Sequence, residues 1–170
     1  MSVLLLAIGN PLRGDDGVGP FLLADWRRGD GRHSGCRSGQ RRVRSLQASS
    51  QPQLTPDLAE RLQGVSQWLL LDAWCCVDPT AQAQLRLLQP RRSAAGWCSH
   101  QLEAEELLAL VLQLQGVAPR AHHLLIPAFA FPYTPPQAGR AAFSSLLRAR
   151  LPRARRLLRR WCHRALAWDA

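Results

Sequence analysis

The sequence predicts an α/β fold, a three-layer sandwich in which a mostly parallel, twisted, five-stranded sheet carries helices on both faces. Short apolar runs with few polar interruptions are typical of strands that are buried on both faces. These runs alternate along the chain with longer amphipathic segments that indicate helices, as in a layered α/β protein. Neither an internal repeat nor a linker divides the 170 residues, so we expect a single domain over 1–170.

Five segments have the composition expected of strands. They are residues 2–8, 43–48, 65–71, 84–88 and 123–127. If the strand order begins 2-1-3, as in flavodoxin-like sheets, the first and third strands are neighbours. The loops that follow those two strands would then share one crevice at the carboxyl edge of the sheet, where open α/β sheets bind ligands.

Two helices are expected in the first half of the chain. Pro20 is a favoured first-turn residue, and the helix that it begins should end before Gly29. Thr55 and Pro56 indicate the N-cap and the first position of a second helix. Between these helices, residues 29–42 are rich in Gly, Ser and Arg and predict a loop.

Two more helices are expected in the second half. Residues 101–115 carry apolar side chains at the spacing of one helix face and glutamates near their N-terminus, and Gly116 closes the segment. From Gln137 the chain is again helical, with a break expected at Pro152. The arginine-rich part, 148–164, is typical of a solvated helix face whose leucines and tryptophan pack inward.

The composition indicates a folded protein outside the membrane. The apolar fraction is 46% and the mean hydropathy is -0.17, as in a soluble globular chain. No apolar run approaches the ~20 residues that span a bilayer. The N-terminus has no basic residue before its apolar run, unlike a secretory signal. Five cysteines without a CxxC pair indicate reduced thiols, so we expect a cytoplasmic location.

The charge balance is strongly basic, with a formal net charge of +10. All of the basic side chains counted in it are arginines, since lysine is absent. Such a balance is typical of proteins with an anionic partner: nucleic acid, a membrane surface or an acidic protein. It also follows from coding bias towards GC-rich codons. We favour coding bias, because the sequence shows no basic platform with interleaved aromatic residues. We therefore expect no membrane or nucleic-acid partner.

The stretch 9–19 reads GNPLRGDDGVG and joins the first apolar run to the first helix. Its glycines allow a turn that folds tightly around a bound group. The turn has neither the GK[ST] ending of a P-loop nor the GxGxxG spacing of a dinucleotide site, and its carboxylates would repel a phosphate. Asp15 and Asp16 suit a cation or a proton-transfer role; the alternative is a plain turn in which aspartate caps the helix.

Asp72 and His100 are two further candidates for a polar site. Asp72 directly follows the apolar run 68–71, so it lies either at the functional edge of the sheet or in the turn that ends the strand. His100 precedes the helix expected at 101, whose dipole disfavours the imidazolium form; alternatively it is a surface histidine. Asp16, Asp72 and His100 together offer two oxygens and one nitrogen, which suits nickel or zinc with positions left open.

These segments resemble the signatures of the hydrogenase maturation endopeptidases, which trim the C-terminus of the nickel–iron hydrogenase large-subunit precursor. That family reads roughly GN-x-L-x-x-D-[DE]-G-x-G after its first strand, and residues 9–19 match this pattern. A later Asp-Ala step and a His-Gln-Leu step of the family are matched at Asp72 and His100. The resemblance spans most of the chain and implies that Asp16, Asp72 and His100 are both the catalytic and the metal-binding residues.

The resemblance also implies that nickel is supplied by the substrate and that the enzyme holds no permanent cofactor. The ion would place the scissile peptide, polarise its carbonyl or activate a water, with Asp15 or Asp16 as a candidate base. The partner would be the hydrogenase large-subunit precursor, and the protein is expected to be a monomer. The segment 53–59, QLTPDLA, resembles the branch that processes bidirectional, NAD(P)-linked hydrogenases.

Two segments depart from the family pattern. Residues 47–50 read QASS where several branches carry a DGGT turn, and residues 129–132 read FAFP where a glutamate and glycines are frequent. Substrate contacts of those loops cannot be transferred to this chain. Two other functions stay open: a non-catalytic metal- or precursor-binding assembly factor and, through the basic charge, a nucleic-acid enzyme of similar topology such as a peptidyl-tRNA hydrolase.

Overall fold

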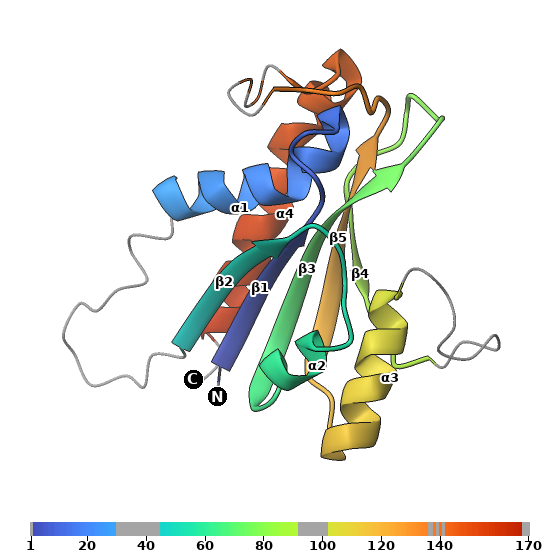
Figure 1. The fold of residues 1–170 in the computed structure, drawn as a ribbon. Helices are drawn as coiled ribbons and strands as arrows, with labels where there is room; N and C mark the ends of the chain where they lie inside the picture. The colour runs from blue at the N-terminus through green and yellow to red at the C-terminus, as the bar shows by residue number, and fades with distance from the viewer. Residues whose placement is uncertain are drawn as a thin grey trace.

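The structure, a computed structural model, describes residues 2–29, 45–91, 102–135, 138, 140 and 142–167. Its centre is a five-stranded sheet in the order β2-β1-β3-β5-β4 (Figure 1). The strands are β1 (Ser2–Ile8), β2 (Ser45–Gln51), β3 (Val65–Cys75), β4 (Gln84–Leu87) and β5 (Arg120–Ala128). Neighbouring strands pair in parallel, except that β4 runs antiparallel to β5 at one edge. The predicted fold class and the 2-1-3 strand order are confirmed.

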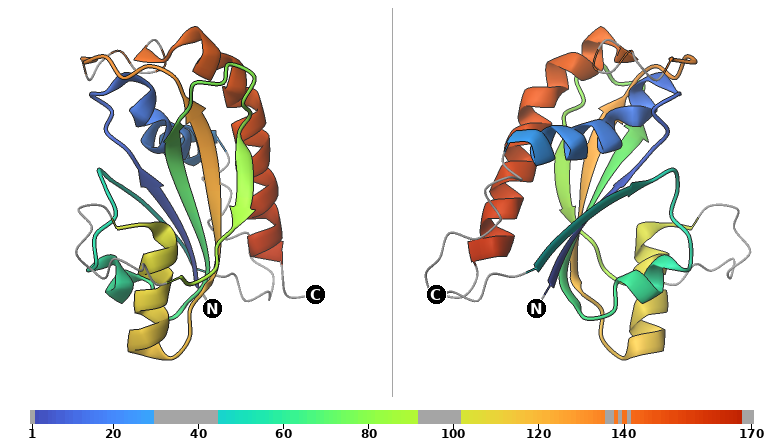
Figure 2. Two further views of the ribbon diagram at one scale, coloured as in Figure 1. Left: turned by 90° about the vertical axis from the view of Figure 1, so that its right-hand side faces the viewer. Right: turned by 60° about the vertical axis from the view of Figure 1, so that its left-hand side comes forward.

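Helices cover both faces of the sheet, which gives the three layers visible in Figure 2. One face carries α1 (Val18–Gly29) and α4 (Ser145–Ala167), and the other carries α2 (Leu58–Arg61) and α3 (Ala104–Gln115). A 3-10 turn, η1 (Gly14–Gly17), precedes α1. Among the residues described, no helix has both the length and the hydrophobicity needed to cross a bilayer.

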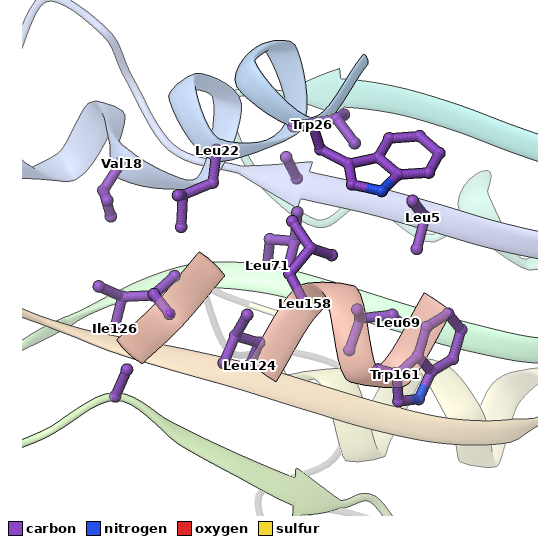
Figure 3. Close-up of a cluster of buried hydrophobic side chains, with 14 of the residues drawn as sticks. Leu5, Val18, Leu22, Trp26, Leu69, Leu71, Leu124, Ile126, Leu158 and Trp161 are labelled. Carbon is purple, nitrogen blue, oxygen red and sulfur yellow. The ribbon is translucent and has the colours of Figure 1, made fainter. Parts of the chain in front are cut away.

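The strand β1 is buried along most of its length because both of its faces are covered. Leu5 packs under α1 and α4, whereas Leu4 and Leu6 pack on the side of α2 and α3. Side chains alternate across a strand, so an apolar run without polar members supplies both cores at once. Figure 3 shows the core under α1 and α4, to which Leu71 of the sheet and Leu158 of α4 both contribute.

Helix boundaries in the first half of the chain differ from those expected. The helix α1 begins two residues before Pro20, because η1 leads directly into it, and it includes Gly29. The N-cap position of α2 belongs to Asp57, which makes no side-chain cap. Thr55 contributes a backbone carbonyl to the first turn instead, so the N-cap predicted there is wrong. Most of the predicted loop, residues 30–42, lies outside the described residues.

The strands β3 and β5 are both longer than expected. The first continues past Asp72 to Cys75, and the second begins at Arg120 instead of His123. They pair in parallel from Gln67 to the end of β3, so the ladder of backbone hydrogen bonds extends each strand beyond its apolar run. Asp72 therefore lies inside a strand, and the expectation that it marks the strand end is wrong.

The helix α4 runs without interruption through Pro152, so the break expected there is wrong. Proline in a helix interior costs about 3 kcal/mol, because a backbone hydrogen bond is lost. Leu151, Leu158 and Trp161 lie on the buried face of the same helix, as the sequence predicted. Burying one large apolar side chain contributes about 1.5–3 kcal/mol, so the packing outweighs the cost of a proline that is itself exposed.

Part of the basic charge has a structural role in α4. Arg150 and Arg153 donate from Nε to the carbonyl oxygens of Ala81 (2.8 Å) and Ala83 (2.9 Å), in the segment that joins β3 to β4. Arg155 donates from Nε to a carboxylate oxygen on α1 at 2.8 Å. These arginines hold α4 against its neighbours, so their charge does not by itself indicate an anionic partner.

Candidate active site

The GNPLRGDDGVG stretch folds into a tight turn that connects β1 to α1 through η1. Gly9 has a φ of 135°, and a Cβ there would lie 2.0 Å from the backbone oxygen of Asp16. Glycine tolerates both this backbone angle and this close approach, which other residues do not. The approach brings Asp16 back over the start of the turn, where its Oδ2 accepts a hydrogen bond from the backbone N–H of Asn10 at 3.1 Å.

Asp15, the neighbouring acid, has a different role. Its side chain is completely buried, and its two oxygens accept four hydrogen bonds. The donors are the backbone N–H groups of Phe129 (2.8 Å), Ala130 (3.1 Å) and Ser144 (2.7 Å) and the Ser144 hydroxyl (2.7 Å). Oδ2 accepts three of these bonds and Oδ1 accepts one, so Asp15 clamps the turn to the loop after β5 and to the start of α4.

A second set of contacts joins the turn to the same loop. The backbone N–H of Gly14 donates to the Thr134 hydroxyl at 3.2 Å, and the Thr134 N–H donates to the Leu12 carbonyl at 2.9 Å. Leu12 and Tyr133 are exposed beside these bonds, at 37% and 78%. The two loops therefore form one rim at the carboxyl edge of the sheet.

The departing QASS segment, residues 47–50, lies within β2 and is not a turn. Ser49 accepts a hydrogen bond on its hydroxyl oxygen from Arg61 at 2.8 Å, which ties β2 to the end of α2. The departing FAFP segment supplies backbone donors to Asp15, as described above. The QASS segment contributes to the scaffold through the Ser49 hydroxyl, and the FAFP segment contributes through backbone N–H groups. Replacing other side chains in the two segments leaves these hydrogen bonds intact.

A second glycine packs α1 against the carboxyl end of β1 and the neighbouring part of β3. A Cβ at Gly19 would lie 2.5 Å from the carbonyl oxygen of Ile8 and 2.8 Å from that of Leu71. Leu71 immediately precedes Asp72, whose side chain is 28% exposed. The η1 turn that carries Asp16 is in contact with the strand that carries Asp72, so the two predicted acids belong to touching elements at one edge of the sheet.

His100 lies outside the described residues, so the structure does not place the third predicted ligand. The helix expected at 101 begins at Ala104, where Glu106 accepts a hydrogen bond from the Glu103 N–H at 2.9 Å and caps the first turn. The prediction that a helix dipole keeps His100 neutral falls on a residue outside the described ones and stays a prediction. Within the described part of the chain, no cluster of three or more His, Cys, Asp or Glu side chains is arranged to hold a metal ion.

Two adjacent histidines on β5, His122 and His123, were not predicted as site residues. Nε2 of His123 lies 3.7 Å from Oδ2 of Asp72, which makes this imidazole a neighbour of a predicted site residue. His122 faces the opposite side, with its ring 6.0 Å from that of Trp161. Burial, with a smaller effect from the Arg120 charge, lowers the pKa of His122 below its usual 6.5. Only the strand register decides which histidine meets the aspartate.

Comparison with known proteins places the fold. No family model matches the chain, and the search of curated proteins found no match. Solved structures match it over nearly its whole length. HybD, a [NiFe] hydrogenase maturation protease from Thermococcus kodakarensis, is 17% identical, with a TM-score of 0.61, and the match covers 95% of this chain and 99% of that one.

Two further structures are similar. The hydrogenase maturating endopeptidase HybD from E. coli is 16% identical, with a TM-score of 0.60, over 93% of this chain and 90% of that one. The hydrogenase 2 maturation peptidase from a Thaumarchaeota archaeon is 19% identical, with a TM-score of 0.57, over 99% and 100%. At such identities the likeness concerns the arrangement of the backbone. The chain thus has the fold of the solved hydrogenase maturation proteases.

Proposed function

We propose that this protein is an endopeptidase that removes the C-terminal extension of a hydrogenase large-subunit precursor already loaded with nickel. The observation that carries the proposal is the contact between the turn of Asp16 and the strand of Asp72. Solved proteases that share the fold over more than nine-tenths of this chain support the same activity.

In this proposal Asp16, Asp72 and His100 bind the nickel that the precursor carries. Two carboxylates and one imidazole leave coordination positions for groups of the substrate. One oxygen of Asp16 is held by Asn10, and the other has no hydrogen-bond partner among the described residues, so this carboxylate is oriented before substrate arrives. Binding the ion places the scissile peptide, a water adds to its carbonyl carbon, the C–N bond breaks and the released amine takes a proton.

Of the two acids in the turn, Asp16 rather than Asp15 is available to the reaction, either as a nickel ligand or as the base. Asp15 is completely buried, and hydrogen bonds from the Ser144 hydroxyl and from backbone N–H groups occupy its oxygens. Asp16 is only half-buried and retains one carboxylate oxygen that no described donor occupies. A general base must be able to hydrogen-bond the attacking water, which the complete burial of Asp15 excludes and the open oxygen of Asp16 permits.

The substrate branch and the cellular setting belong to the same proposal. The QLTPDLA segment, residues 53–59, supports a precursor of a bidirectional, NAD(P)-linked hydrogenase as the substrate. We expect the enzyme to act as a cytoplasmic monomer. It needs no permanent cofactor in this scheme, because the nickel arrives with the precursor.

The test is processing of purified, nickel-loaded precursor, followed by mass spectrometry. Each of the variants Asp16→Ala, Asp72→Ala and His100→Ala should slow cleavage by about 100-fold or more, since even the partners of metal ligands contribute about 10–100-fold. Asp57→Ala and His163→Ala are matched controls, because both side chains are exposed away from the site, and they should cleave like wild type.

The outcomes separate the three functions. Cleavage at the wild-type rate by all three site variants would show that the site lies elsewhere. Tight precursor binding without any shortening by the wild-type protein would replace the protease with an assembly factor. Salt-sensitive tRNA binding, with no action on the precursor, would favour an enzyme like peptidyl-tRNA hydrolase.

A further inference from the structure

His123 and Asp72 face the same side of the sheet. In the parallel pairing of β3 with β5, His123 lies opposite Leu70, and Asp72 lies opposite Leu125. Side chains alternate along a strand, so Leu70 and Asp72 share a face, and directly opposite residues on paired strands share a face as well. His123 is therefore a diagonal neighbour of Asp72.

The two side chains are close to each other, but no hydrogen bond joins them. Nε2 of His123 lies 3.7 Å from Oδ2 of Asp72, and the two side chains are 14% and 28% exposed. Nε2 is shielded from solvent and has no hydrogen-bond partner among the described residues. The separation exceeds a hydrogen bond and is too short for a water molecule between the atoms. A buried ring nitrogen without a partner is unfavourable, so a small rotation of the Asp72 carboxylate towards it is favourable.

We propose that His123 is a positioning residue for Asp72, donating a hydrogen bond from Nε2–H to Oδ2 so that Oδ1 is turned towards the substrate. The hydrogen bond tightens when Asp72 engages the substrate, as catalytic hydrogen bonds often do. This inference rests on the proposed function, since it assigns the support of a carboxylate that the proposed reaction uses. Groups that orient a ligand in this way commonly stand directly behind it.

His123 lies deeper in the sheet than Asp72, which favours a positioning role over direct metal binding. Opposite Leu70, it lies two positions deeper along the parallel strands than Leu125, which is opposite Asp72. The loops of the candidate site follow the carboxyl ends of these strands. An ion bound at that edge lies nearer to Asp72 than to His123. The imidazole is therefore placed to orient the carboxylate and not to bind the ion.

His122 provides a matched control for this role. It is the adjacent residue on the same strand, and its Nδ1 is also buried without a described partner. Its ring faces the other side of the sheet, beside Trp161. Replacing either histidine removes the same chemical group from β5, but only His123 can act through Asp72.

The first experiment measures precursor processing as kcat and KM in a double-mutant cycle. His123→Leu should lower kcat by about 10–100-fold with little change in KM. His123→Gln, which keeps a donor near Nε2, should recover most of that loss, and His122→Leu should stay near wild type. In an Asp72→Asn background, His123→Leu should cost less than about 3-fold further, because the role passes through Asp72. Wild-type kcat in His123→Leu, or an equal loss in both backgrounds, would overturn the proposal.

The second experiment needs no proteolysis, so it separates failure of this inference from failure of the proposed function. In protein labelled with 15N-histidine at a fixed pH, His123 should carry its proton on Nε2, and Asp72→Asn should shift that nitrogen signal while leaving His122 unchanged. A proton on Nδ1, or a signal that ignores the Asp72 substitution, would overturn the positioning role. If the spectrum agrees while wild-type protein leaves the precursor intact, the proposed protease function fails and the His123–Asp72 pairing stands.

Discussion

Asp15 and Ser144 are 129 positions apart in the sequence and are joined by two hydrogen bonds of 2.7 Å, one from the backbone N–H and one from the hydroxyl of Ser144. The same hydroxyl accepts a hydrogen bond from the Leu147 N–H at 3.1 Å, so Ser144 caps α4. One buried carboxylate therefore ties together the turn after β1, the loop after β5 and the first turn of α4. The turn that carries Asp16 depends on this clamp for its shape.

Removing the clamp should destabilise the protein strongly. In Asp15→Ala, four donors lose their acceptor. Each unsatisfied buried group costs about 1–3 kcal/mol, so we expect the free energy of unfolding to fall by about 3 kcal/mol or more. Ser144→Ala removes only the hydroxyl and should cost about 1–3 kcal/mol. Urea unfolding, with Asp57→Ala as the acid-to-alanine control, measures both effects, and an Asp15→Ala protein as stable as that control would contradict the clamp.

Gly9 should be irreplaceable in the turn. Alanine there needs a φ of 135° and places a Cβ 2.0 Å from the Asp16 backbone oxygen, so the turn must change shape. We expect Gly9→Ala to lower the thermal unfolding temperature and to abolish precursor processing. Gly64→Ala is the matched control, since its φ of 70° is also positive but no atom lies within 4 Å of the added Cβ. It should cost only about 1 kcal/mol of backbone strain. Equal losses for the two variants would mean that the close approach is unimportant.

His122 should make stability depend on pH. Burial lowers its pKa in the folded state below the usual 6.5, so the unfolded chain binds a proton at a higher pH than the folded chain does. Between the two pKa values the unfolded state holds more protons, and the free energy of unfolding therefore rises with pH. This contribution is complete above the unfolded pKa and is lost as the pH falls.

The corresponding measurement compares unfolding at about pH 7 and about pH 5. His122→Phe keeps an aromatic ring beside Trp161 and should lose less stability on acidification than wild type. His163→Phe removes an exposed histidine and should keep the wild-type dependence. A steeper loss in His122→Phe than in wild type would reverse the assigned sign.

Pro152→Ala should stabilise α4. Alanine restores a backbone N–H inside the helix and is about 3 kcal/mol more favourable than proline in a helix interior. Loss of the proline restraint on the unfolded chain offsets about 0.4–1 kcal/mol of this gain. We therefore expect a net increase of about 1–3 kcal/mol in the free energy of unfolding. A decrease would mean that the surrounding helix is adapted to proline.

The local pattern of the sequence was sufficient for the strands and for several turns. A strand covered on both faces needs apolar side chains on both sides, so an unbroken apolar run such as 3–8 predicts a central strand wherever its partners lie. Gly116 likewise predicted the end of α3, where its φ is 72°, because glycine favours that conformation. The prediction for Pro152 was wrong because the burial that holds α4 together comes from residues distant in the chain.

In the candidate site, too, the local sequence decided some features and the tertiary structure decided others. The spacing of glycines and acids in GNPLRGDDGVG, a property of adjacent residues, made Asp15 and Asp16 candidates, and the family resemblance favoured them over a plain turn. Which of the two is buried by Ser144, and which of two neighbouring histidines lies beside Asp72, was decided by the tertiary structure alone. Adjacent side chains on a strand or in a turn point in different directions, and only the pairing of distant segments determines what each direction meets.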